Sequence, residues 1–131
     1  TGGFPVLARF TLGGHPFEVL QGLDGHMAGQ VYLASRELGV LFTGDSLINL
    51  EGLTPERRAF NSLAVNLITS VNVDRDLARR ERAGLLALAA SWDKEGRKEG
   101  RRCLVCGGHG PVSVLKGESL VTFGAMERYR P

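Results

Sequence analysis

The chain has 131 residues, of which 43% are hydrophobic and 23% charged, a composition typical of one globular domain spanning residues 1–131. The formal net charge of +2 does not indicate a nucleic-acid or membrane surface, and no apolar stretch reaches the length of a membrane span. Two cysteines make no disulfide framework, so we expect a cytoplasmic protein. From the charge and the hydropathy we expect no membrane partner and no nucleic-acid partner. Because the chain begins Thr-Gly-Gly rather than with methionine, we expect it to be either a processed piece of a longer protein or a portion of one chosen for expression.

The first half of the chain alternates β-forming runs with turn residues. The runs ARFTL and FEVLQ flank the turn sequence GGHP and predict a β-hairpin. QVYLAS is a third run rich in β-formers, and GVLFT is a short run that is apolar on both faces, as buried strands are. Residues 36–39 join the last two runs as a second hairpin. A turn near Arg36–Glu37 brings His26, just before the third strand, opposite the region of Asp45, just after the fourth.

The second half predicts helices followed by returning strands. Thr54-Pro55-Glu56 is a helix start, and a second helix begins near Asn72 or Asp74. DKEGRKEGRR predicts a solvated loop, CLVC a short buried strand, and SLVTF a last strand. The expected apolar helix faces are Phe60, Leu63, Leu67 and Ile68, then Leu77, Leu85, Leu88 and Trp92, with Arg75, Arg79, Glu81 and Arg82 in other directions. The predicted fold class is α/β (α+β), a mixed β-sheet covered by helices on one face.

Three residues of metal-ligating type stand just outside predicted strands. His26 lies in DGHMAG before the third strand, Asp45 follows the fourth strand in FTGD, and His109 lies in CGGHGP after CLVC. Loops beyond the carboxyl ends of strands are where open α/β sheets collect ligands, and flanking glycines leave an imidazole uncrowded. Each residue alone has an ordinary explanation, as a loop histidine or a capping aspartate. Together His26, Asp45 and His109 are the candidate metal ligands.

Other motifs have structural explanations. Cys103-x-x-Cys106 followed by His109 imitates a zinc knuckle, but residues three apart in a strand point to opposite faces. We therefore expect the cysteines to act as small buried hydrophobes. His15 lies in a hairpin turn and is expected at the surface. The loop GGHG lacks the lysine of a phosphate-binding loop.

Two stretches resemble known metal motifs. DGHMAGQVYLASRELGVLFTGDSL is similar to the third and fourth motifs of the metallo-β-lactamase-fold hydrolases, and CGGHGP is similar to the last motif of the same family. The resemblance extends from about Ala8 to Pro111 in the family's order. Asp24 stands where proline is usual and Met27 where threonine is usual; these positions shape the turn. The His-x-His-x-Asp-His stretch of the first half of the family's fold is absent from this chain.

The resemblance implies the C-terminal half of an αββα metallo-β-lactamase fold. It implies that His26 completes one metal site, Asp45 bridges two metals, and His109 serves the second. The metal would be zinc, or iron or manganese, in a binuclear centre of the intact protein. The implied activity is a metal-dependent hydrolase that attacks an ester-like, thioester, lactam or phosphodiester bond of a small-molecule substrate. Catalytic residues beyond the metal ligands are unknown, and this chain alone is expected to bind metal weakly and to be inactive.

A second hypothesis is a non-catalytic binding or assembly module that keeps the half-fold without a complete metal site. In either case one face of the sheet lacks cover within this chain. We expect the N-terminal half of a longer protein, or a second copy of this chain in a homodimer, to cover that face. A His-x-His-x-Asp-His stretch upstream of Thr1 would favour the enzyme over the module.

Overall fold

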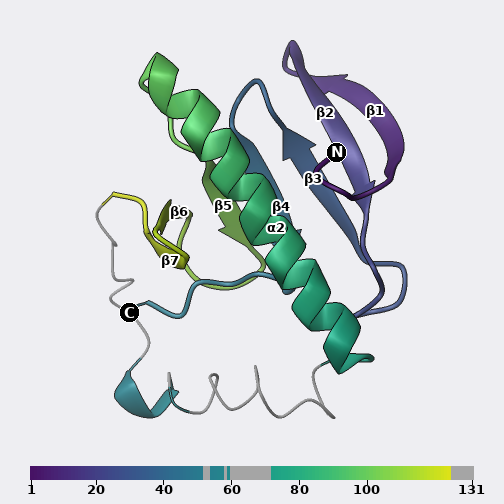
Figure 1. Ribbon diagram of the computed structural model, residues 1–131, viewed down its shortest axis with the longest axis vertical. Coiled ribbons are helices and arrows are strands. Elements are labelled where there is room, and N and C mark those ends of the chain that lie inside the picture. The colour runs from purple at the N-terminus through teal and green to yellow at the C-terminus, as the bar shows by residue number, and fades with distance from the viewer. Residues whose placement is uncertain (52–53, 58, 60–71, 125–131) are drawn as a thin grey trace.

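The computed structural model describes residues 1–51, 54–57, 59 and 72–124. Its elements follow in the order β1 (Val6–Leu12), β2 (His15–Gln21), β3 (Val31–Ser35), β4 (Val40–Gly44), α2 (Arg75–Gly96), the short 3₁₀ helix η1 (Arg97–Glu99), β5 (Leu104–Gly107), β6 (Ser113–Lys116) and β7 (Ser119–Thr122). Figure 1 shows α2 lying diagonally across the strands. None of the helices in the described ranges is long and apolar enough to cross a membrane.

The strands form a mixed seven-stranded sheet in the order β1-β2-β3-β4-β5-β6-β7. Neighbouring strands are antiparallel except β4 and β5, which are parallel. A parallel pair needs a crossover connection, and the chain between these two strands contains α2. The predicted fold class, a mixed α+β sheet with a helix on one face, is confirmed. Because β4 and β5 are parallel, their carboxyl ends lie at the same end of the sheet.

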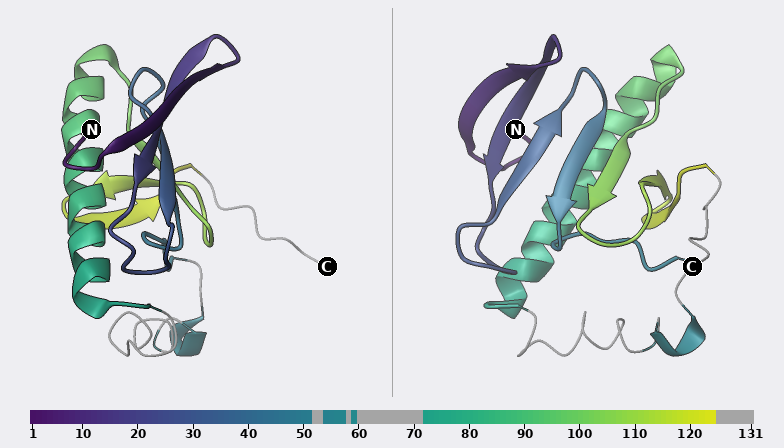
Figure 2. Two further views of the ribbon diagram at one scale, coloured as in Figure 1. Left: turned by 90° about the vertical axis from the view of Figure 1, so that its right-hand side faces the viewer. Right: turned by 180° about the vertical axis from the view of Figure 1, so that it is seen from behind.

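Strand pairing separates the side chains of the sheet into two faces. Ala34, Leu41 and Val105 form one row across three strands, and all three are buried. This row belongs to the core, together with Leu85 and Trp92 from α2. The two views in Figure 2 show α2 against this side of the central strands, whereas no helix of the described residues lies against the other side. The opposite face carries the row Ala8, Val19, Leu33, Phe42 and Cys106.

Helix α2 begins and ends with clear local signals. The Asp74 carboxylate caps its first turn by accepting from the Leu77 N–H at 2.9 Å. Its start therefore agrees with the position predicted from the sequence. The helix continues to Gly96, three residues past Asp93, where the solvated loop was predicted to begin. The predicted end of the helix was therefore wrong.

Asp93 explains why the helix runs on. Its side chain is 7% exposed and forms ion pairs with Arg97 at 2.8 Å and Arg102 at 2.7 Å. The Cys103 N–H also donates to it, at 3.0 Å. Burial alone raises the pKa of Asp93, but these three bonds outweigh burial and hold the pKa at about 2. Asp93 is thus a buried acceptor that ties the end of α2 to the start of β5, whereas Lys94, Lys98 and Glu99 in the same run are exposed, as predicted.

Two further expectations about the strands were wrong in detail. Ser35 pairs with Val40, so the second hairpin turns around residues 37 and 38, which shifts the pairing by two residues. A shift of two leaves every side chain on its face, because alternation in a strand has a period of two. Strand β6 had no counterpart in the sequence-based prediction.

The first predicted helix is described only at its start. Pro55, Glu56, Arg57 and Ala59 are helical, and the Arg57 N–H donates to Thr54 Oγ1 at 3.3 Å, as a cap should. Its predicted apolar face at Phe60, Leu63, Leu67 and Ile68 lies outside the described residues.

Candidate metal centre

Asp45 and His109 follow the two parallel strands that end at the same edge. Gly44 at the end of β4 pairs with Gly107 at the end of β5, and the Gly108 N–H donates to the Gly44 carbonyl at 2.7 Å. Gly108 lies so close to Asp45 that a Cβ there would stand 2.2 Å from Asp45 Oδ1. The glycine pair in CGGHGP therefore allows the His109 loop to pack directly on the aspartate.

The structure brings all three candidate ligands together around the Asp45 carboxylate. His26 Nε2 lies 3.8 Å from Asp45 Oδ2, and His109 Nε2 lies 3.6 Å from Asp45 Oδ1. Each imidazole thus approaches a different oxygen of one carboxylate. The side chains are 11% exposed at His26, 42% at Asp45 and 76% at His109. The centre is therefore closed on the His26 side and open to solvent on the His109 side.

Asn72 fixes which nitrogen of His26 faces Asp45. The His26 Nδ1 atom lies 3.1 Å from Asn72 Oδ1, a carbonyl oxygen that only accepts hydrogen bonds. In neutral His26, Nδ1 therefore carries the proton and Nε2 carries the lone pair. That lone pair points toward an anionic oxygen, so two acceptors face each other. A proton or a metal cation between them would satisfy both.

The donor set fits a carboxylate shared between two histidine ligands. Two ligand atoms on one tetrahedral zinc ion lie about 3.3 Å apart, because each bond measures about 2.0–2.1 Å. Each histidine–aspartate distance is only a few tenths of an ångström longer. Within the described ranges, however, no three His, Cys, Asp or Glu side chains lie close enough together to hold one ion. The geometry thus fits one histidine and one carboxylate oxygen per ion, with further ligands still required, and the metal role stays a prediction.

The turn that carries His26 is held in an unusual backbone conformation. Asp24 has φ = 62°, and its carboxylate accepts from the Gly29 N–H at 2.8 Å, which closes the turn. Proline is restricted to φ near −65° and cannot adopt this conformation. The departure from the usual proline at this position therefore reflects a different way of building the turn.

The turn that carries Asp45 is held by side chains beneath it. Thr43 is buried and its hydroxyl donates to the Leu47 carbonyl at 2.7 Å, which ties β4 to the segment after the aspartate. Ser46 is also buried, and its hydroxyl accepts from the Tyr32 hydroxyl at 3.0 Å. These bonds hold the turn from below, so that Asp45 itself faces the two histidines.

The remaining motifs behave as structural residues. Cys103 is fully buried in the core, and burial raises the pKa of its thiol to about 12. Cys106 is partly exposed and lies in the row on the opposite face of the sheet. His15 is a surface residue whose Nδ1 lies 2.7 Å from Glu37. Both cysteines are free thiols.

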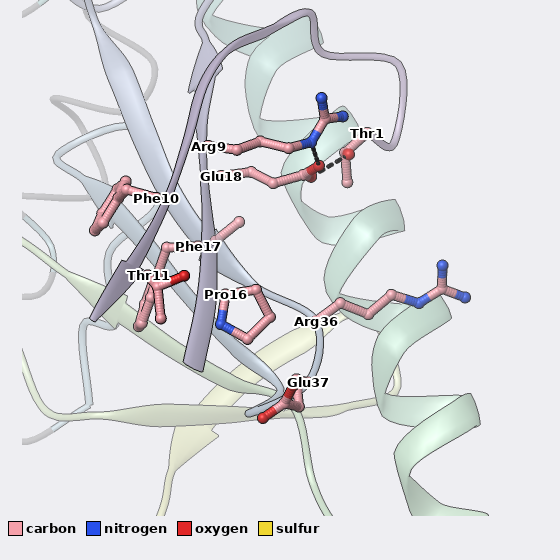
Figure 3. Close-up of a pocket in the computed structure, with 10 residues that line it drawn as sticks. Thr1, Arg9, Phe10, Thr11, Pro16, Phe17, Glu18, Arg36 and Glu37 are labelled. Atoms are coloured by element: carbon pink, nitrogen blue, oxygen red, sulfur yellow. Dashed lines mark hydrogen bonds and ion pairs between the residues drawn. The ribbon is translucent and has the colours of Figure 1, made fainter. Parts of the chain in front are cut away.

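A separate hollow lies away from the three ligands. Its volume is about 430 Å³, and it is lined by Thr1, Arg9, Phe10, Thr11, Pro16, Phe17, Glu18, Ala34, Arg36 and Glu37. Figure 3 shows Arg9 and Thr1 converging on Glu18 above the stacked Phe10 and Phe17 rings. None of the candidate ligands lines it, so this hollow is not part of the metal centre.

Sequence reasoning missed three residues that support the centre: Asn72, Glu81 and Arg82. Glu81 was expected to point away from the apolar stripe of α2, but it is fully buried. The signal was present, because Glu81 stands four residues from both Leu77 and Leu85 and therefore on the same face. Arg82 was expected on a solvated face, but it is half-buried and contacts the Asp45 turn.

Comparison with known proteins found a likeness in structure but none in sequence. No protein-family model and no curated protein matches the chain. The structure is similar to a metallo-beta-lactamase from Pontibacter korlensis, with a TM-score of 0.44 and 20% sequence identity. The match covers 82% of this chain and 40% of that one, so the chain spans about two fifths of that protein's length. A likeness of this degree does not assign the chain to a family.

Proposed function

We propose that this chain is the C-terminal part of a metal-dependent hydrolase of the metallo-β-lactamase superfamily. One observation carries the proposal: imidazoles from two distant turns approach the two oxygens of a single carboxylate, at 3.8 and 3.6 Å. A carboxylate in this position screens the repulsion between two cations, as a bridging ligand does. The three residues lie beyond strand ends at one edge of the sheet, which is a common place for a site in α/β folds.

Each ligand has a distinct part in this proposal. Asp45 contributes one oxygen to each half of the centre, and His26, held by Asn72, contributes the nitrogen of the closed half. His109 contributes the nitrogen of the open half, where its exposure gives a small substrate access. When bound, the metal ions supply Lewis acidity and an activated water for attack on an ester-like, thioester, lactam or phosphodiester bond.

Three ligands do not complete two metal sites, because zinc in proteins usually takes three or four protein ligands. The remaining ligands must come from elsewhere, and we propose that an N-terminal half of the same protein supplies them. The uncovered face of the sheet, with Leu33 and Phe42 both exposed, is the surface on which that half would pack.

The full-length protein tests the proposal. Its sequence upstream of Thr1 is expected to contain a His-x-His-x-Asp-His stretch. With zinc, iron or manganese restored, that protein should hydrolyse at least one chromogenic ester, thioester, lactam or phosphodiester, and Asp45→Ala should abolish the activity. A full-length protein that lacks the upstream stretch and hydrolyses none of these would overturn the proposal.

The apolar face also favours a second candidate, a non-catalytic assembly module. A module of this kind needs the exposed row on the sheet but not the histidine–aspartate centre. Substitution of His109 would then leave its partner binding unchanged, whereas a charge at Phe42 would abolish it. The two candidates are distinguished by which of these substitutions removes function.

A further inference from the structure

Two neighbouring residues of α2 reach the two turns that carry His26 and Asp45. Glu81 accepts hydrogen bonds from the Leu23 N–H at 2.5 Å and from the His26 N–H at 3.3 Å. Arg82, the next residue, donates from Nε to the Ser46 carbonyl at 3.1 Å. One helix position thus holds the backbone of the His26 turn, and the next holds the backbone of the Asp45 turn.

The His26 turn is seated directly on the helix. A Cβ at Gly25 would stand 2.1 Å from the Ala78 backbone nitrogen, so the turn and α2 are in close contact. The Asp74 N–H donates to the Gly25 carbonyl at 2.9 Å, and the Val73 N–H donates to the His26 carbonyl at 3.3 Å. The His26 turn is therefore hydrogen-bonded both to Val73 and Asp74, just before α2, and to Glu81 within α2.

Buried charge gives a reason to assign a role to these side chains. Glu81 is 0% exposed, and a buried carboxylate is costly compared with an apolar side chain of similar volume. Burial raises the pKa of the Tyr32 hydroxyl, and the Glu81 carboxylate raises it further. Tyr32 in turn donates to Ser46 in the Asp45 turn. Tyr32 and Arg82 thus both bond to Ser46, and Glu81 bonds to the neighbouring His26 turn.

We propose that Glu81 and Arg82 are positioning residues that set the separation between His26 and Asp45 before any metal binds. The helix backbone fixes the separation between Glu81 and Arg82, so the two turns cannot move apart without breaking one of these hydrogen bonds. The predicted effect on metal binding rests on the proposed function. The positioning of the two turns does not, because it is a property of the metal-free protein.

The first experiment measures the metal-free protein by hydrogen exchange of its backbone amides. The Leu23 and His26 amides should exchange slowly in the native protein, and at least one of them should exchange about tenfold faster or more in Glu81→Gln, because the glutamine side chain presents only one acceptor oxygen. Arg79→Ala, an exposed change on the same helix, is the matched control and should leave both amides unchanged. Unchanged exchange in Glu81→Gln would overturn the proposal.

The second experiment separates positioning from a general loss of stability by a double-mutant cycle on zinc affinity. Glu81→Gln should weaken zinc binding by about 10- to 100-fold, as loss of a supporting residue typically does, and should have no effect once His26→Ala is present. Arg82→Ala should likewise weaken binding and lose its effect in an Asp45→Ala background.

Equal losses with and without the ligand would show a merely structural role and would overturn the proposal. Arg82 is only half-buried, so Arg82→Ala should disturb folding less than a change at the fully buried Glu81. It therefore provides the test if Glu81→Gln fails to fold. If the full-length protein binds no zinc but the Leu23 and His26 amides are protected through Glu81, the positioning stands and the proposed function fails.

Discussion

His26 and Asn72 contact each other although 46 residues separate them in the chain, with Nδ1 of the histidine 3.1 Å from Oδ1 of the asparagine. The contact orients the imidazole and selects its tautomer, so that Nε2 faces Asp45. The candidate ligand nitrogen of His26 therefore already faces Asp45 in the metal-free protein.

Replacing Asn72 by alanine should remove the hydrogen bond that selects the tautomer of His26. Without an acceptor at Nδ1, His26 should populate both neutral tautomers, which ¹⁵N chemical shifts of the ring nitrogens distinguish. His15, whose Nδ1 contacts Glu37 on the surface, serves as the internal control and should keep its shifts. Retention of the single Nδ1–H tautomer in Asn72→Ala would show that another group selects it.

A methyl group at Gly108 should disturb Asp45 without touching any candidate ligand chemically. The new carbon would stand 2.2 Å from Asp45 Oδ1, so the carboxylate must rotate away from His109. Zinc affinity, measured by calorimetry, should fall by about tenfold or more. At Gly100 the added carbon meets nothing within 4 Å, although φ is 72°. Gly100→Ala should therefore cost stability but leave zinc affinity unchanged, and equal affinities in the two variants would contradict the close contact at Gly108.

Asp93 should make the stability of the fold depend on acidic pH. Its pKa falls from 3.8 to about 2 on folding, so its contribution is fully present above about pH 4 and is lost as the pH falls through about 2. The shift corresponds to about 2 kcal/mol at pH 7. Urea unfolding of Asp93→Asn should show a deficit of that size at pH 7 and a much smaller one near pH 2. A deficit that does not change with pH would exclude the charge as its cause.

The uncovered sheet face should make the isolated chain associate. The row Ala8, Val19, Leu33, Phe42 and Cys106 carries no charge, so a second copy meets it without like-charge repulsion. Sedimentation at micromolar concentration should detect a dimer that Phe42→Lys converts to monomer. Val112, which is 42% exposed like Phe42, provides the matched control, and Val112→Lys should remain dimeric. A native chain that sediments as a monomer contradicts this expectation.

The sequence was sufficient for every described strand except β6, because alternation of apolar side chains reports which face is buried. It also placed the three candidate ligands at strand ends, since turn residues mark those ends. Hairpin register was less certain, because a shift of two residues preserves every face. Glu81 and Asp93 were misjudged since a charged residue was taken as a sign of solvent exposure. The donors to Glu81 lie 58 and 55 positions away in the sequence, at Leu23 and His26. The donors to Asp93 lie within 10 positions of it, and the packing of the end of α2 beside β5 brings them together.

The central claim is that His26, Asp45 and His109 together ligate metal. Zinc titration followed by NMR of the ring nitrogens tests it most directly, because the chain contains only three histidines. Added zinc should shift the Nε2 signals of His26 and His109, leave those of His15 in place, and have no effect on any of them in Asp45→Ala. Binding is expected to be weak because further ligands are needed to complete each site. Zinc binding that survives Asp45→Ala and disappears with Cys103→Ser would contradict the claim and favour a cysteine site instead.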